Sequence, residues 1–162
     1  MTQELLELRS LLESGRYTEA LTMVDELEDM SKQAILRNID SFLVRLMIHL
    51  IKFQVENRLT RSWLASITDS IIQISKLNLK GNKSSYYIPK SEWESFLEDA
   101  VEEALLPASL EIFEGALNAD ELSDRLDRSR LFSLTQKLLN LTYHYSRREL
   151  RQNIEKVLDS GY

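Results

Sequence analysis

Several features that would narrow the fold are missing or scarce in this chain of 162 residues. It has no cysteine, which excludes disulfides and zinc sites built on thiolates. Four glycines and two prolines are too few for the many tight turns of an all-β protein, and they favour long helices. No apolar run reaches the length of about 18 residues that a membrane span needs. The acidic start, Thr2–Leu6, does not resemble a signal peptide, so we expect a soluble, cytoplasmic protein.

The net charge of −6 is divided unevenly along the chain. Residues 1–30 carry −6, residues 31–80 carry +5, residues 81–130 carry −7 and residues 131–162 carry +2. The basic segment is dilute, so we interpret it mainly as helices that pack beside acidic ones, with nucleic-acid binding as an alternative. Residues 143–148, Tyr-His-Tyr-Ser-Arg-Arg, mix aromatic and basic side chains as some RNA-contacting surfaces do, although packing of the tyrosines explains them more simply.

The N-terminal third of the chain predicts three helices. The first should run from Gln3 to Ser14 and end at Gly15, because glycine readily adopts the left-handed conformation that follows a helix. A second helix should begin after a cap at Thr18 and form a hairpin with the first. This junction resembles that of a tetratricopeptide repeat, but no second copy follows at the spacing of such repeats. The third and longest helix should run over Ser31–Asn57, with its first serine as the cap.

The remaining helices are separated by polar breaks. Thr60 should cap a helix that ends at Asn78, and a loop over residues 80–85 should follow. Ser91, with a glutamate three residues later, has the form of a capping box and should start the next helix. Pro107 should kink or divide that helix, because proline lacks an N–H and clashes with the preceding turn.

The end of the chain continues the helical pattern. A segment from about residue 120 should bend near residues 128–130 and enter a last helix over residues 131–158. No stretch alternates with the two-residue period of a strand, so we predict an all-α fold, an antiparallel bundle of five to seven helices. We expect one domain, with a bundle core over residues 1–118 and a C-terminal helical extension over residues 119–162.

His49 is the most suggestive candidate for a functional residue. On a helix it shares a face with Arg45 and Lys52 and borders the apolar seam, so it suits acid–base chemistry, metal binding or a purely structural hydrogen bond to a neighbouring helix. A metal would also need a ligand from the acidic run, Asp25, Glu26, Glu28 or Asp29, and neither histidine has a glutamate three residues before it. With no HExxH motif and no glycine-rich phosphate loop, we expect no metal and no cofactor.

Three segments around this histidine resemble a known family. They are Leu-Glu-Asp-Met at residues 27–30, His-Leu-Ile-Lys-Phe-Gln at residues 49–54 and Arg-Ser-Trp at residues 61–63. They are similar to motifs of the family called domain of unknown function twenty-nine, which is widespread in cyanobacteria, and the resemblance covers Leu5 to Phe113. It implies an all-helical bundle without an assigned activity. It also implies that five residues share one cluster: Glu28, His49, Lys52, Arg61 and Trp63.

These observations favour a non-enzymatic binding or interaction module, with a protein partner or a homodimer. The contact site would comprise His49, Lys52, Arg61 and Trp63. Arginine and tryptophan often anchor a partner, and the chain shows no catalytic set. One alternative is an enzyme, a metal-assisted hydrolase that uses His49 with Glu26 or Glu28. Another is weak binding of nucleic acid through residues 31–80.

Overall fold

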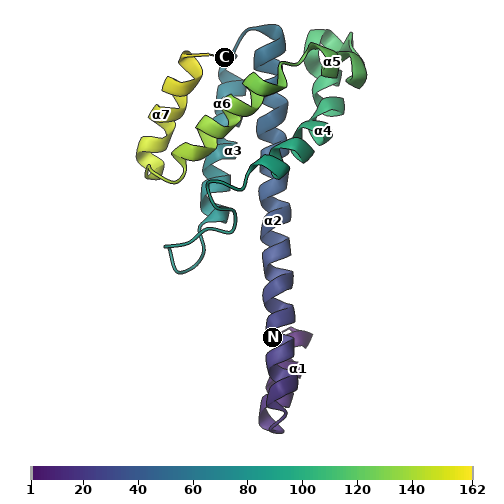
Figure 1. Ribbon diagram of the computed structural model, residues 1–162, viewed down its shortest axis with the longest axis vertical. Coiled ribbons are helices and arrows are strands. Elements are labelled where there is room, and N and C mark those ends of the chain that lie inside the picture. Colours follow the sequence, from purple (N-terminus) through teal and green to yellow (C-terminus); the bar gives the residue numbers. More distant parts are fainter. Residues whose placement is uncertain (1, 162) are drawn as a thin grey trace. The chain divides into compact units, whose positions relative to one another are not determined.

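The computed structural model describes residues 2–161, and their regular structure is helical (Figure 1). The helices are α1 (Gln3–Glu13), α2 (Tyr17–Glu56), α3 (Arg61–Asn78), α4 (Glu94–Glu111), α5 (Ala119–Arg125), α6 (Arg128–Leu141) and α7 (Arg147–Asp159), with a short 3₁₀ turn, η1 (Ile112–Gly115), after α4. No strand occurs among the described residues beyond one isolated bridge between Leu79 and Tyr86. The all-α prediction is therefore confirmed, and the seven α-helices lie within the predicted number.

The chain divides into two compact units, Met1–Arg37 and Asn38–Tyr162. The first holds α1 and the beginning of α2, and the second holds the rest of α2 and all later helices. Within the second unit α5 packs on α4, and α7 packs on both α3 and α6. The predicted extension over residues 119–162 thus contributes helices to the same unit as α3 and α4. One domain, with a boundary after residue 118, stays a prediction.

The long helix α2 corrects the predicted pair of helices over residues 18–57. It continues without a break from Tyr17 to Glu56, so the predicted cap at Ser31 is wrong. Serine and aspartate favour caps but do not forbid a helix interior, and α2 contains no glycine or proline to end it earlier. It stops where Asn57 takes a left-handed backbone conformation, with φ of 51°.

Two predicted helix ends, at Gly15 and Thr60, agree with the structure, whereas the predicted cap at Thr18 is wrong because α2 already begins at Tyr17. Gly15 has φ of 76° after α1, and the Thr60 hydroxyl accepts the backbone N–H of Trp63 at 3.1 Å. The predicted capping box at Ser91 is wrong, because α4 begins only at Glu94. The residue before it, Trp93, is fully buried and provides no side-chain cap. α4 also continues past its proline to Glu111, so the proline does not divide it.

The predicted last helix over residues 131–158 is two helices, because α6 ends at Leu141 and α7 begins at Arg147. Between them the Tyr143 hydroxyl accepts the indole N–H of Trp93 at 2.7 Å and donates to the carbonyl oxygen of Ile88 at 2.7 Å. This anchor holds the chain in a turn between two helices of similar apolar spacing. Periodicity alone does not reveal it, since it depends on partners that lie fifty and fifty-five positions earlier.

The core of the second unit is built around α2 and α3. Nine of their apolar side chains are fully buried: Ile39, Leu43, Leu46, Met47, Leu50, Ile51, Ile67, Ile71 and Ile74. Each such side chain contributes about 1.5–3 kcal/mol relative to exposure. Buried polar groups are paired as well, since the Asn78 side chain accepts the backbone N–H of Ile88 at 2.7 Å and donates to its carbonyl at 2.9 Å. None of the described helices combines the length and apolar content required to cross a membrane.

Candidate functional site

Two of the predicted site residues, Lys52 on α2 and Trp63 on α3, are in direct contact. The Lys52 ammonium lies 4.7 Å from the centroid of the Trp63 ring and 3.3 Å from a carboxylate oxygen of Glu111. The lysine is 5% exposed and the tryptophan 8% exposed. A cation over an indole face is attracted by the ring quadrupole, and the attraction grows when water is excluded. The contact therefore stabilises the junction of α2, α3 and the end of α4, and a partner reaches neither side chain in this arrangement.

Arg58 and Glu111 complete this cluster and were not predicted. The Arg58 guanidinium lies 4.7 Å from the Trp63 ring centroid and 3.4 Å from Glu56, so two cations lie near one indole. Arg58 stands five residues before the tryptophan, and an arginine so close to a predicted site could have been included. Glu111 follows Lys52 by 59 positions and carries no sequence signal that joins the two.

His49 is half-buried, one helical turn before Lys52. Its Nδ1 lies 2.8 Å from the carbonyl oxygen of Arg45, which can only accept, so Nδ1 carries the proton and donates to its own helix. Burial lowers the pKa of His49, and the positive charge of Lys52 lowers it further, whereas the hydrogen bond to Arg45 and the charge of Glu111 oppose the shift. The ring is therefore neutral at pH 7, with Nε2 left as an acceptor.

The ligands that a metal at His49 would need are not assembled among the described residues. Within residues 2–161, no group of three or more histidine, aspartate or glutamate side chains is placed to hold a metal ion. Glu26 and Glu28 are exposed residues of the first unit, whereas His49 belongs to the second. The ligand set inferred for a hydrolase depended on a turn between them, and α2 contains no such turn.

The remaining polar residues near this cluster lie closer to the surface. Arg61 is the exposed first residue of α3, and within residues 2–161 its side chain forms no hydrogen bond or ion pair. Arg45 and Asp69 link α2 to α3 through a contact of 2.8 Å, and this hydrogen bond lowers the pKa of Asp69. Of the five predicted residues, the structure thus joins Lys52 to Trp63, with His49 one turn away.

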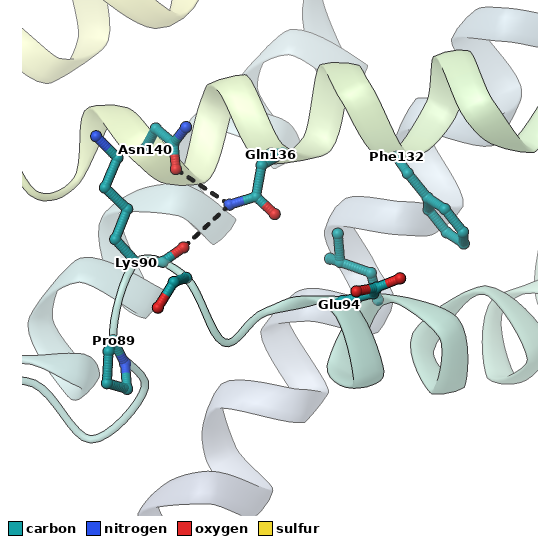
Figure 2. Close-up of a pocket in the computed structure, with 8 residues that line it drawn as sticks. Pro89, Lys90, Glu94, Phe132, Gln136 and Asn140 are labelled. Carbon is teal, nitrogen blue, oxygen red and sulfur yellow. Dashed lines mark hydrogen bonds between the residues drawn. The ribbon is translucent and has the colours of Figure 1, made fainter.

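A separate open groove of about 840 Å³ lies between the start of α4 and α6 (Figure 2). At one end the Gln136 amide donates to the backbone oxygen of Lys90 at 3.4 Å and to the side-chain oxygen of Asn140 at 3.1 Å. Glu94 and Phe132 lie together at the other end. No predicted site residue lines this groove. Its polar groups are partly paired with each other, and its two charged side chains, on Lys90 and Glu94, have opposite signs.

Comparison with known proteins places the chain in a family without supplying an activity. No curated protein and no solved structure matches it. The family model for the domain of unknown function DUF29 matches residues 8–120, from α1 into α5. This span contains all five predicted site residues and confirms the resemblance seen around His49 and Trp63. The chain therefore belongs to the DUF29 family.

Proposed function

We propose that the protein is a non-enzymatic binding module whose N-terminal hairpin, Met1–Arg37, binds a basic amphipathic helix of another protein. The observation that supports this proposal is the exposure of large apolar side chains on the hairpin, between 43% and 66%. We call five of them the apolar face: Leu5, Leu12, Tyr17, Leu21 and Val24. Among the described residues of the hairpin only Ala20 is buried.

Helical geometry places these five residues on one side. In α1 the two leucines of the face lie beside Leu8, and in α2 the other three recur at positions i, i+4 and i+7 beside Ala20. The connection over residues 14–16 is short, so the two helices run antiparallel. The side of each helix that faces the other one, at Leu8 in α1 and at Ala20 in α2, is its inner stripe. In both helices the apolar face is displaced from the inner stripe in the same rotational sense. Two antiparallel helices that meet along their inner stripes then present both displaced rows on the same side.

Charge favours a basic partner over a second copy of this chain. Residues 1–37 contain eight acidic and four basic side chains. Two copies that met through this face would bring two segments of net negative charge together, and like charges across an interface oppose association. A basic amphipathic helix would cover the apolar face and meet this segment with opposite charge. Such helices bind through apolar side chains three and four residues apart.

The predicted surface around His49 and Arg61 is the second candidate for the contact. Two exposed arginines support it, because the Arg58 guanidinium lies over the Trp63 ring and Arg61 begins α3. This surface is basic, so it would suit an acidic segment. It offers less apolar area than the hairpin, and we therefore rank it second.

Two synthetic helical peptides test the proposal. Both carry leucine at the apolar positions of each heptad, and one carries lysine and the other glutamate at the remaining positions. In isothermal titration we expect the lysine peptide to bind and the glutamate peptide not to bind. Replacing Leu21 and Val24 together by serine should weaken binding about tenfold or more, since two apolar anchors are lost. Leu110→Ser, at a leucine of α4 that is 69% exposed, is the matched control.

Three outcomes would contradict this assignment. Equal weakening by Leu110→Ser would mean that the peptide adheres to any exposed leucine. A sedimentation mass of two chains that returns to one in the Leu21/Val24 variant would show that a second copy covers the face. Loss of peptide binding in Arg61→Ala, with the hairpin variant unaffected, would move the contact to the surface around His49.

A further inference from the structure

A second hollow, of about 580 Å³, lies between the end of α3, the loop after it and the start of α7. We call it the basic pocket. Four lysine or arginine side chains line it, Lys76, Lys80, Lys83 and Arg147, and no aspartate or glutamate does. In a chain with a net charge of −6, this concentration of positive charge is unusual. No acidic residue in the lining of the pocket balances this positive charge.

The four cations are not neutralised by acidic partners. Within residues 2–161, none of them forms an ion pair. Lys80 lies over the ring of Tyr87, with its ammonium 5.4 Å from the centroid. Lys76 acts on Asp69 only through its charge, and that carboxylate already accepts a hydrogen bond from Arg45. Positive groups that share a hollow repel one another, so an anion between them would lower the energy of the site.

Further polar groups border the same hollow. Arg147 is the first residue of α7, a helix of 13 residues, and Ser146 before it forms no side-chain cap bond. The first N–H groups of this helix therefore lack a side-chain acceptor, and the positive end of its dipole points to the region of the cations. His144 also lines the pocket, and its Nε2 lies 2.9 Å from the ammonium of Lys90.

The wall of the pocket is held in place before any ligand arrives. Tyr143 lines it and is anchored to Trp93 and Ile88, as described above. Asn78, just before the pocket loop, also donates to the Tyr143 hydroxyl at 3.2 Å. Leu79 pairs with Tyr86 across the base of the loop. A pocket wall that is ordered before binding costs less conformational freedom when a ligand arrives than a flexible one does.

We infer that the basic pocket binds a small ligand that carries two or more phosphate groups, such as pyrophosphate or a nucleoside triphosphate. Its volume lies within the range of about 300–1,000 Å³ that is typical of small-molecule sites. A single phosphate group carries about two negative charges, fewer than the four cations supply, whereas a chain of phosphates carries enough to balance all of them. Tyr145, 40% exposed, adds an aromatic surface on which a base can stack.

Isothermal titration with pyrophosphate and with ATP, both without magnesium, tests this inference. The matched variants are Lys83→Gln with Arg147→Gln in the pocket, and Lys32→Gln with Lys137→Gln at exposed positions outside it. Both pairs remove two positive charges, so they separate local contacts from net charge. We expect the pocket variant to weaken binding about tenfold or more, because charge-assisted hydrogen bonds are lost, and the control to change it about twofold or less. Raising the salt should weaken binding of the wild type.

The two ligands also identify the source of the phosphates. Equal affinities would mean that two phosphate groups suffice. Tighter binding of ATP would mean that its third phosphate or its nucleoside contributes, and inorganic triphosphate separates these two. The inference fails if neither ligand binds, or if both variants weaken binding equally. It also fails if the affinity for single-stranded RNA increases with the length of the RNA and pyrophosphate does not displace the RNA, because the site would then bind nucleic acid. This test uses none of the variants of the apolar face, so its result is independent of the proposed function.

Discussion

The two compact units differ in what their apolar side chains contact. In the second unit every helix from α3 to α7 buries apolar side chains, whereas the described part of the hairpin buries only Ala20. The contrast exists within one helix, since Leu21 and Leu46 both belong to α2 and are 66% and 0% exposed. Amphipathic spacing forms a helix in both places. Only a further layer of structure on the apolar face turns that spacing into a core.

Polar interactions follow the same division. In the hairpin, Arg9 pairs with Glu13 at 2.9 Å, and Arg16 pairs with Glu19, all on exposed side chains. Such pairs contribute about 0–1 kcal/mol each. The second unit instead places the Tyr143 hydroxyl among three partners. Its polar groups specify one arrangement of helices, whereas those of the hairpin keep an open surface hydrated.

The largest expected difference comes from two leucine-to-alanine substitutions in α2. Leu46→Ala should lower the free energy of unfolding by about 2–5 kcal/mol, because it removes buried contacts and leaves a cavity. Leu21→Ala should change it by about 0.5 kcal/mol or less, because this side chain is already in water. Urea unfolding at several protein concentrations measures both. A similar cost at both positions would show that the hairpin is covered in solution and would remove the contrast.

The fold class and several helix ends were predictable because they depend on local chemistry. Gly15 and Thr60 act on residues within one turn, and their roles are visible in a short window of sequence. The predictions of helix ends that were wrong concern residues that occur both at helix caps and inside helices. Ser31 suits a cap or a helix interior, and the choice depends on whether the chain is forced to turn. Exposure of the hairpin was not predictable for a related reason, since spacing shows an apolar face but not what covers it.

The second prediction concerns the hydrogen-bonded hydroxyl of Tyr143 in the second unit. The described residues of the hairpin contain no buried polar group of this kind. Tyr143→Phe should lower the free energy of unfolding by about 1–3 kcal/mol, because the indole N–H of Trp93 and the carbonyl of Ile88 lose a partner. Tyr145→Phe is the control, since that side chain is exposed. Thermal unfolding compares the two variants. If Tyr143→Phe were as stable as the control, water would be replacing the hydroxyl, and the turn between α6 and α7 would need another explanation.

The candidate site shows the same limit of sequence reasoning. The contact of Lys52 with Trp63 joins residues only eleven positions apart, on consecutive helices within a family motif, and it was anticipated. The Glu111 carboxylate reaches the same lysine from α4, and only the packing of three helices brings it there. Glu28 was grouped with these residues through the resemblance, and it lies in the other unit. Its role in a shared site stays a prediction.

The third prediction is a pH dependence that originates in the second unit. Burial lowers the pKa of His49 below its ordinary value of 6.5, so the folded protein binds this proton less tightly than the unfolded chain. The stabilisation is complete above pH 6.5 and is lost as the pH falls through the window below it. In His49→Gln the decrease in melting temperature between neutral and acidic pH should shrink by about 2 °C. Thermal unfolding of both proteins across this pH range measures the effect, and an equal decrease in the two would contradict it.

The smallest expected effect concerns repulsion between carboxylates. The acidic side chains of the hairpin are exposed, whereas the second unit brings Asp40 of α2 close to Glu103 of α4. Burial raises the pKa of Glu103, and repulsion from Asp40, with which it shares a hydrogen bond, raises it further. The folded protein therefore binds this proton more tightly than the unfolded chain, and stability is lost as the pH rises above the ordinary value of 4.5. Glu103→Gln should raise the melting temperature by about 1 °C at pH 7.

The sign of that effect separates repulsion from an ordinary surface substitution. Below pH 4.5 the unfolded carboxyl is also protonated, so the gain from Glu103→Gln should vanish there. Glu98→Gln, on an exposed turn of α4, removes the same charge from a carboxylate whose acidic neighbours, Glu94 and Glu102, lie on its own helix and not on α2, and it should give a smaller gain at pH 7. If Glu98→Gln stabilised the protein equally at pH 7, the gain would come from the net charge of −6, and the acidic pair would have no separate cost. The second unit would then resemble the hairpin in how it tolerates its acidic side chains.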